Sequence, residues 1–233
     1  MNSIQSLSYE PNVSRGPVWG QWNDVYVLDP ITGLVAFPSF LKTFKYLFTE
    51  LLYSFNGVGL AIGDVDHLKT YVESVRNKDP LMFGHLAGNA FMSKLGMIGL
   101  GAFEQMPFPW RCLATFGGDE IILAGAGCSR SAFVSSVQGL SGTLSASLPR
   151  TVSFAHGWFA LSREQRCRTI DDVSAASLSL SVIAMVDRAL FNCKAQRDKL
   201  GTNNLPMVTM MKTRWLRGDR WTLAEGQDGL NTT

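Results

Sequence analysis

The sequence predicts an α+β fold in which helices flank a mixed, mostly antiparallel central sheet. Apolar residues recur at helical spacing from Phe37 to Leu52, which predicts a strong amphipathic helix that ends at Asn56-Gly57. The run Val58–Val65 is short, apolar and rich in small and branched residues, as expected of a buried strand. The two apolar runs 112–116 and 120–124 flank Gly-Gly-Asp, which predicts a hairpin rather than another parallel unit.

The remaining elements follow in chain order. A helix is expected after the first strand, up to about Tyr71, and the charged segment 73–82, which carries Pro80, reads as a loop insertion. Residues 86–100 predict another helix, although three glycines weaken the pattern.

After the hairpin, residues 129–148 predict a helix, 151–161 a strand and 171–200 a long helix. The resulting order, α-β-α-α-β-β-α-β-α, is typical of a ferredoxin-like or palm-type sheet covered by helices.

The length of 233 residues, 46% of them apolar, suits one sizeable core. Residues 1–24 are polar and interrupted by Pro and Gly, so they predict a flexible arm. The main domain is expected over 25–204 and a C-terminal extension over 205–233.

Charge and cysteine content exclude several classes of function. The formal net charge of +2 gives no broad basic surface for a nucleic-acid polymer or an anionic membrane. The first twenty residues hold no continuous apolar stretch, so we expect a cytoplasmic protein that does not bind membranes. The four cysteines show no C-x-x-C spacing, which argues against a zinc site or a disulfide scaffold.

Two acidic tips carry the candidate chemistry. Asp64 and Asp66 end the first strand, and Asp119 and Glu120 occupy the hairpin turn. If the two strands are neighbours, their carboxylates converge into a site suited to Mg²⁺ and the phosphates of a nucleoside triphosphate. The alternatives are a helix N-cap for the first pair and a solvated turn for the second.

Five segments in the same order resemble the signatures of the GGDEF family of diguanylate cyclases. They are DPITGL (29–34), GDVDHLK (63–69), FGH-x-x-G (83–88), GGDEI (117–121) and VDRALFNCK (186–194). The resemblance covers about residues 24–200. It implies a palm-like sheet, two Mg²⁺ ions and condensation of two GTP molecules into cyclic di-GMP by two domains that meet face to face.

The resemblance also implies the roles of individual residues. Asp64, the carbonyl of Val65 and Asp119 match the metal ligands, and Asp119 or Glu120 would support the base that acts on the 3′-hydroxyl. The residues that match or lie near phosphate-binding positions are His67, Leu68, Lys69, Lys194 and Arg197, of which Arg197 is offset from the family's arginine. For the lysines, the alternative is a solvated charge.

The positions that would read the base depart from the family. The asparagine and aspartate that recognise guanine fall on Val72 and Asn89, so ATP becomes a second candidate substrate. The insertion could relocate recognition, with Asn77 as a candidate against the alternative of an exposed loop residue. The inhibitory Arg-x-x-Asp ahead of the hairpin is replaced by 108–111 (FPWR), so feedback control is expected to be absent.

The leading hypothesis is a cyclase that uses Mg²⁺, with Mn²⁺ as an alternative ion, and acts on GTP or ATP as a transient homodimer. Its product is cyclic di-GMP by default, with an adenine-containing product as the variant. The rival hypothesis, motivated by the loss of both base-reading residues, is a catalytically degenerate module that binds nucleotide or a protein partner without turnover.

Overall fold

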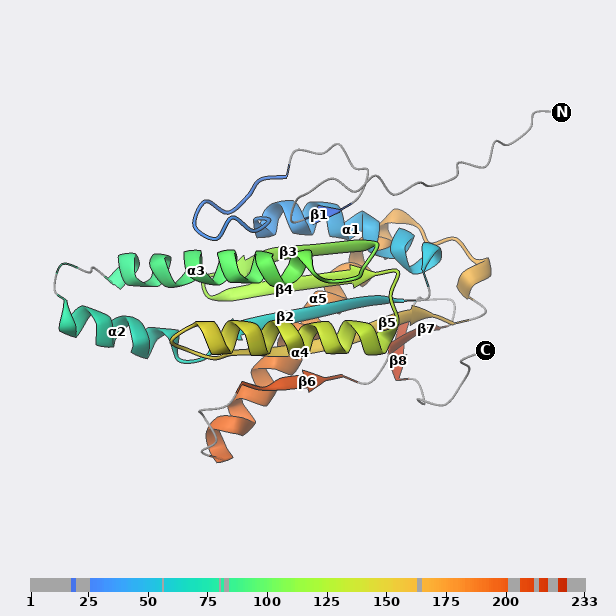
Figure 1. Cartoon of the computed structure of the whole chain (residues 1–233). Helices are drawn as coiled ribbons and strands as arrows, with labels where there is room; N and C mark the ends of the chain where they lie inside the picture. Colours follow the sequence, from blue (N-terminus) through green and yellow to red (C-terminus); the bar gives the residue numbers. More distant parts are fainter. Residues whose placement is uncertain are drawn as a thin grey trace.

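One mixed sheet runs through the molecule. The structure is a computed structural model that describes residues 18–19, 26–55, 57–79, 81, 84–162, 165–200, 206–211, 214–217 and 222–225. Its strands are β1 (Val18–Trp19), β2 (Val58–Val65), β3 (Trp110–Gly117), β4 (Glu120–Ala126), β5 (Val152–Leu161), β6 (Val208–Met210), β7 (Arg214–Arg217) and β8 (Thr222–Glu225). Among these residues the sheet order is β1-β3-β4-β2-β5-β7-β8, with β6 also paired to β5 (Figure 1). Only β6 and β7 run parallel to β5, so the predicted mixed, mostly antiparallel sheet is confirmed.

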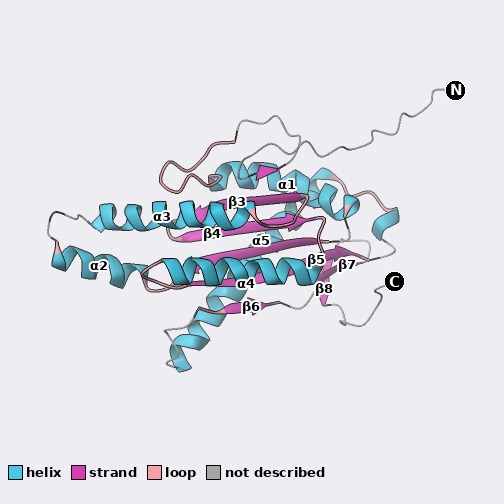
Figure 2. Ribbon diagram, in the orientation of Figure 1, coloured by secondary structure: helices cyan, strands magenta, loops and turns pink. Residues whose placement is uncertain are grey.

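Helices cover both faces of this sheet. They are α1 (Phe37–Ser54), α2 (Leu68–Lys78), α3 (Gly84–Glu104), α4 (Arg130–Ser147) and α5 (Asp172–Leu200), with a short 3₁₀ turn at Gln165–Cys167. The helices α3 and α4 lie across one face, and α1 and α5 lie across the other (Figure 2). The molecule therefore has two hydrophobic cores, one on each side of the sheet.

The central strand β2 takes part in both cores. Leu60 and Ile62 pack on the side of α1 and α5, while Ala61 packs on the side of α3 and α4. Because both faces are covered, the strand is almost continuously apolar, and its observed bounds are those predicted from the sequence. The same alternation places Asp64 on the face that α5 covers.

The segment after β2 differs from the prediction. The expectation that 73–82 forms a loop was wrong, because α2 continues to Lys78. No residue of α2 is fully buried, although Leu68, Tyr71, Val72 and Val75 recur along it at helical spacing. Its charged residues are good helix formers, and Arg76 and Lys78 in the last turn favour the negative end of the helix dipole.

Both terminal regions add strands to the sheet. The strand β1 pairs with β3 and ends the described sheet on that side. The rest of the predicted N-terminal arm lies outside the described residues. Strands β6 and β7 pair with β5, so part of the predicted C-terminal extension shares the same sheet.

Among the described residues, α5 is the one helix long and apolar enough to cross a membrane. Its residues Val182, Val186 and Leu190 are buried in the core that it shares with α1. A core helix of a soluble protein meets the same criteria of length and composition, so this finding is weak evidence for a membrane span.

A turn before α1 holds α3 in place. The Asp29 carboxylate accepts hydrogen bonds from the backbone N–H of Ile31 and from the N–H and hydroxyl of Thr32. Gly33, at φ +71°, adopts the left-handed conformation that glycine accommodates without strain. A Cβ on Gly96 would overlap the carbonyl oxygen of Thr32, so α3 approaches this turn through a glycine.

Substitution of Gly96 by alanine should destabilise the protein. The added methyl group must separate α3 from the turn, which costs about 1–3 kcal/mol by the usual penalty for overpacking. Gly101→Ala is the matched control, since no atom lies within 4 Å of a Cβ there. That variant should be neutral or more stable by up to about 1 kcal/mol, because alanine is the better helix former. Urea unfolding of both variants measures the difference, and equal stabilities would refute the steric explanation.

Candidate functional site

Polar side chains form a row across the three central strands at one end of the sheet. In the strand register, Asp64 of β2 lies opposite Glu120 of β4 and opposite Ser153 of β5. Residues directly opposite one another in neighbouring strands point to the same face. For these three residues, that is the face covered by α5.

The hairpin turn completes the acidic edge. Gly118 adopts φ +54°, the left-handed conformation that this tight turn requires. Asp119 follows, and its carbonyl oxygen accepts a hydrogen bond of 3.3 Å from the N–H of Val65. The two acidic tips are thus joined directly, and the structure brings them together as the sequence predicts.

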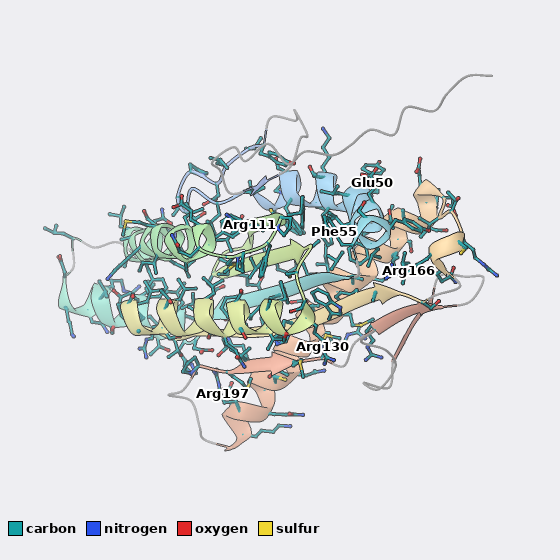
Figure 3. The ribbon with its side chains drawn as sticks, turned by 45° about the vertical axis from the view of Figure 1, so that its right-hand side comes forward. Glu50, Phe55, Arg111, Arg130, Arg166 and Arg197 are labelled. Carbon is teal, nitrogen blue, oxygen red and sulfur yellow. The ribbon has the colours of Figure 1, made fainter. Side chains whose placement is uncertain are left out.

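The helix α5 brings cations to this row. The Lys194 ammonium forms an ion pair with Oδ1 of Asp64 and lies 3.3 Å from Oδ1 of Asp66. Arg197, three residues later on the same helix, donates to Oδ1 of Asp66 at 2.8 Å. Figure 3 shows Arg197 on the C-terminal half of α5.

Asp66 is buried at 1% exposure and bonded at both carboxylate oxygens. Its Oδ2 accepts hydrogen bonds from the hydroxyls of Thr151 and Ser153, each at 2.7 Å. Burial raises the pKa of Asp66, but the hydrogen bonds from Arg197, Ser153 and Thr151 and the charge of Lys194 outweigh it and hold the pKa below its ordinary value. Asp66 is therefore a structural carboxylate with all its acceptor positions occupied.

This network corrects one interpretation of the sequence and weakens another. The helix-cap alternative for Asp64 and Asp66 was wrong, because His67 is the N-cap of α2 and no side chain caps it. Arg197 is buried, and its guanidinium also donates to Ser153 Oγ at 2.9 Å. The phosphate-binding role expected of Arg197 therefore has no support from its position.

Negative charge accumulates beside Asp64. Burial, with the charges of Asp64, Asp187 and Asp119, raises the pKa of Glu120 to about 7. Burial also raises the pKa of Asp64, against the opposing hydrogen bond and charge of Lys194. Asp187, on α5, is close enough for its charge to act on Glu120, and it was not singled out from the sequence. This edge carries more carboxylates than one lysine can neutralise.

The carboxylates fit a divalent cation by their chemistry. Carboxylate oxygens are the ligands that Mg²⁺ prefers, and burial together with the neighbouring carboxylates raises the pKa of Glu120. Within the described part of the chain, no three His, Cys, Asp or Glu side chains are already gathered to hold a metal ion. The Lys194 ammonium lies against Asp64 instead.

The start of α2 lies next to this edge. His67 adopts the left-handed conformation at φ 55°, uncommon for a residue with a side chain, and Leu68 begins the helix. A left-handed residue before a helix directs successive backbone N–H groups outward, an arrangement that favours anions. Lys69 is exposed in this first turn. The predicted phosphate-binding residues His67, Leu68 and Lys69 are thus adjacent to the acids.

The two positions expected to read the base lie on facing helices. Val72 is on α2, and its Cγ2 lies 3.9 Å from where a Cβ on Gly88 of α3 would be. Asn89 follows on α3 and is exposed. Asn77, the alternative amide, is exposed in the last turn of α2. The α2–α3 pair therefore presents an apolar residue and an amide at the two positions where the resemblance to the GGDEF family implies two polar groups.

Arg111 has a local role beside α3 (Figure 3). Its guanidinium donates to the carbonyl of Glu104, the last residue of that helix, and to the carbonyls of Met106 and Phe108 in the segment that follows. Such bonds satisfy carbonyls that have no partner within a helix. These bonds occupy the guanidinium of Arg111, which lies on β3.

Solved structures with the same arrangement of strands and helices are GGDEF domains. The GGDEF domain of DgcB from Caulobacter crescentus, solved in complex with c-di-GMP, matches with a TM-score of 0.56 at 19% identity over 84% of this chain and 98% of that one. The FimX GGDEF domain from Pseudomonas aeruginosa matches with a TM-score of 0.54 at 15% identity, covering 79% of this chain and 99% of that one. The chain has the GGDEF fold.

A third GGDEF-fold structure is a diguanylate cyclase, SiaD from Pseudomonas aeruginosa, solved with its activator SiaC. It matches with a TM-score of 0.55 at 15% identity, over 79% of this chain and 61% of that one. No family model matches the sequence, and neither does any of the curated proteins with which it was compared. The GGDEF fold is thus established by three-dimensional similarity.

Arg197→Met should destabilise the fold strongly. It leaves the buried Asp66 carboxylate without its main partner, and breaking a buried ion pair in this way costs about 3–5 kcal/mol. Adding Asp66→Asn should recover part of the loss, since the unpaired charge disappears. Asp198→Asn, at an exposed residue of the same helix, is the control and should change stability by less than about 0.5 kcal/mol. Chemical denaturation measures all four proteins; wild-type stability in Arg197→Met would contradict a structural role for this pair.

Proposed function

We propose that this protein is a divalent-cation-dependent nucleotidyl cyclase. It condenses two nucleoside triphosphates into a cyclic dinucleotide, cyclic di-GMP from GTP by default. The observation that carries the proposal is the pairing of Asp64 with Glu120 across β2 and β4, with Asp119 at the adjoining turn. The GGDEF fold supports it, because one structure of that fold is a diguanylate cyclase and another was solved with c-di-GMP.

The carboxylates of Asp64 and Asp119, with the Val65 carbonyl, would hold Mg²⁺ or Mn²⁺. When bound, such an ion neutralises charge on the triphosphate and stabilises the attacking and leaving oxygens of an in-line displacement. Mg²⁺ usually binds proteins through one or two carboxylates together with substrate phosphates, so few protein ligands suffice. Glu120 and Asp187 supply further negative charge around the same edge.

The chain's other residues position the triphosphate and accept a proton. The backbone N–H groups at His67 and Leu68 and the ammonium of Lys69 bind phosphate oxygens at the start of α2. The 3′-hydroxyl of one nucleotide attacks the α-phosphorus of the other, a P–O bond forms, and pyrophosphate leaves. The carboxylate of Glu120, or that of Asp119, accepts the hydroxyl proton.

Closure of a cyclic dinucleotide requires two such attacks. Each chain offers one acidic edge and so holds one triphosphate, and two chains must bring their edges together. We therefore infer a homodimer that forms during turnover.

The base preference follows from α2 and α3. Val72 offers no hydrogen bond to a base edge, and Asn89 presents one acceptor and one donor rather than a carboxylate. Guanine donates two adjacent N–H groups, which a carboxylate accepts together and an amide does not. Selection between GTP and ATP is therefore weak in this site.

The second candidate function is a module that binds nucleotide or a protein partner without turnover. It is favoured by Val72 at a base-reading position and by the arginine on α5 that is buried in a structural ion pair. The two functions share the acidic edge and differ in whether product forms.

The first test is product formation with each nucleoside triphosphate and Mg²⁺ or Mn²⁺, followed by mass spectrometry. Asp64→Asn and Asp119→Asn should each lower turnover at least about 100-fold, the usual cost of removing one group that stabilises charge in a transition state. Glu50→Gln, at an exposed residue of α1, is the control and should keep full activity. Circular dichroism should show folded variants. Full activity in either aspartate variant would refute the metal assignment, and no product from the wild type would favour the non-catalytic module.

The second test concerns the base. Val72→Asn combined with Asn89→Asp should raise the preference for GTP over ATP by about one to two orders of magnitude, because the site gains groups that pair with guanine. Competition with both nucleotides present gives the ratio of bases incorporated by the parent and the double variant. Lys78→Gln, at an exposed residue in the last turn of α2, is the control and should leave that ratio unchanged. A parent that already uses GTP alone, with no gain in the double variant, would show that recognition lies elsewhere.

A further inference from the structure

The Lys194 side chain lies against the acidic edge. Its ammonium contacts Oδ1 of Asp64, the first of the proposed metal ligands, and lies 3.3 Å from Oδ1 of Asp66. Lys194 thus supplies positive charge at the carboxylate where a divalent ion would bind.

The contact between Lys194 and Asp64 is more exposed than the neighbouring contact between Arg197 and Asp66. Asp66 is bonded at both oxygens, and the Arg197 side chain is only 4% exposed. By contrast, the side chains of Lys194 and Asp64 are 21% and 22% exposed. Lysine holds its charge on a flexible four-carbon stem, so its ammonium can move while α5 stays in place.

We propose that Lys194 is a resident counter-cation of this site, which a divalent ion must displace from Asp64. This inference rests on the proposed function of the acidic edge. The displaced ammonium keeps only Asp66, whose oxygens already accept other hydrogen bonds, and the triphosphate that enters with the ion provides a new negative partner. The ion therefore binds poorly to the free protein and well together with nucleotide.

Binding of the divalent ion and binding of nucleotide should strengthen each other. Without nucleotide, a bound ion lies beside the positive charge of Lys194 and takes away Asp64, the nearer of its two carboxylate neighbours, so both effects oppose binding. With nucleotide, Lys194 moves to the phosphates and the opposition is relieved. Because coupling between two ligands is reciprocal, nucleotide must strengthen binding of the ion by the same factor by which the ion strengthens binding of nucleotide.

The experiment measures binding of Mn²⁺ alone to the free protein, by electron paramagnetic resonance or calorimetry. Lys194→Met keeps the length of the side chain and removes its charge, and it should bind Mn²⁺ at least about fivefold more tightly than the wild type, the lower end of typical coupling factors. Lys199→Met removes the same charge from an exposed residue of α5 and should leave the affinity nearly unchanged. Lys194→Gln provides a second variant if Lys194→Met fails to fold.

A non-hydrolysable GTP analogue should shrink or reverse the difference between wild type and Lys194→Met, since the analogue relieves the opposition in the wild type. Adding Asp64→Asn to Lys194→Met should abolish the gain in Mn²⁺ affinity. Equal Mn²⁺ affinities in the wild type and Lys194→Met, or a gain that survives Asp64→Asn, would overturn the inference. The gain in Mn²⁺ affinity without product from any nucleotide would support the inference while refuting the cyclase activity.

Discussion

The position of β2 in the middle of the sheet is the constraint on which the acidic edge depends. The strand pairs with β4 on one side and with β5 on the other along its length. Both registers are fixed because successive side chains of a strand point to opposite faces of the sheet. A shift by one residue would turn Leu60 and Ile62 away from the core beside α5. With the registers fixed, Asp64 can only lie between Glu120 and Ser153. The helix α5 crosses the same face and brings Lys194 and Arg197 to that point.

Charges at this edge are compensated unequally. Asp66 is removed from water, which is costly for a carboxylate, and two hydroxyls and Arg197 offset the cost. Asp64 has a single, partly exposed lysine, and Glu120 holds a pKa of about 7 in the company of other acids. The buried ion pair of Asp66 with Arg197 therefore anchors α5 to the sheet. The more exposed pair of Asp64 with Lys194 is the one that we propose exchanges its lysine for a ligand.

Local patterns in the sequence were enough to predict β2, the hairpin and α5, because each has an apolar period or a glycine turn that needs no distant partner. The length of α2 was underestimated because its charged residues and Pro80 were interpreted as a loop, although Leu68, Tyr71, Val72 and Val75 recur at helical spacing. Arg197 reaches Asp66 across 131 residues, and the identity of that partner is set by how α5 crosses the sheet. Asp187 and Thr151 were missed for the same reason: only the fold places them beside the acids.

The most direct test of the central claim is calorimetric titration of the protein with a non-hydrolysable GTP or ATP analogue, with and without Mg²⁺. The cyclase and a nucleotide-binding module both require the acidic edge to hold the triphosphate through a divalent ion, so this measurement does not depend on turnover. We predict binding with Mg²⁺, much weaker binding without it, and loss of the Mg²⁺ effect in Asp64→Asn. Binding that is indifferent to Mg²⁺ and to Asp64, or no binding of either analogue, would contradict the account.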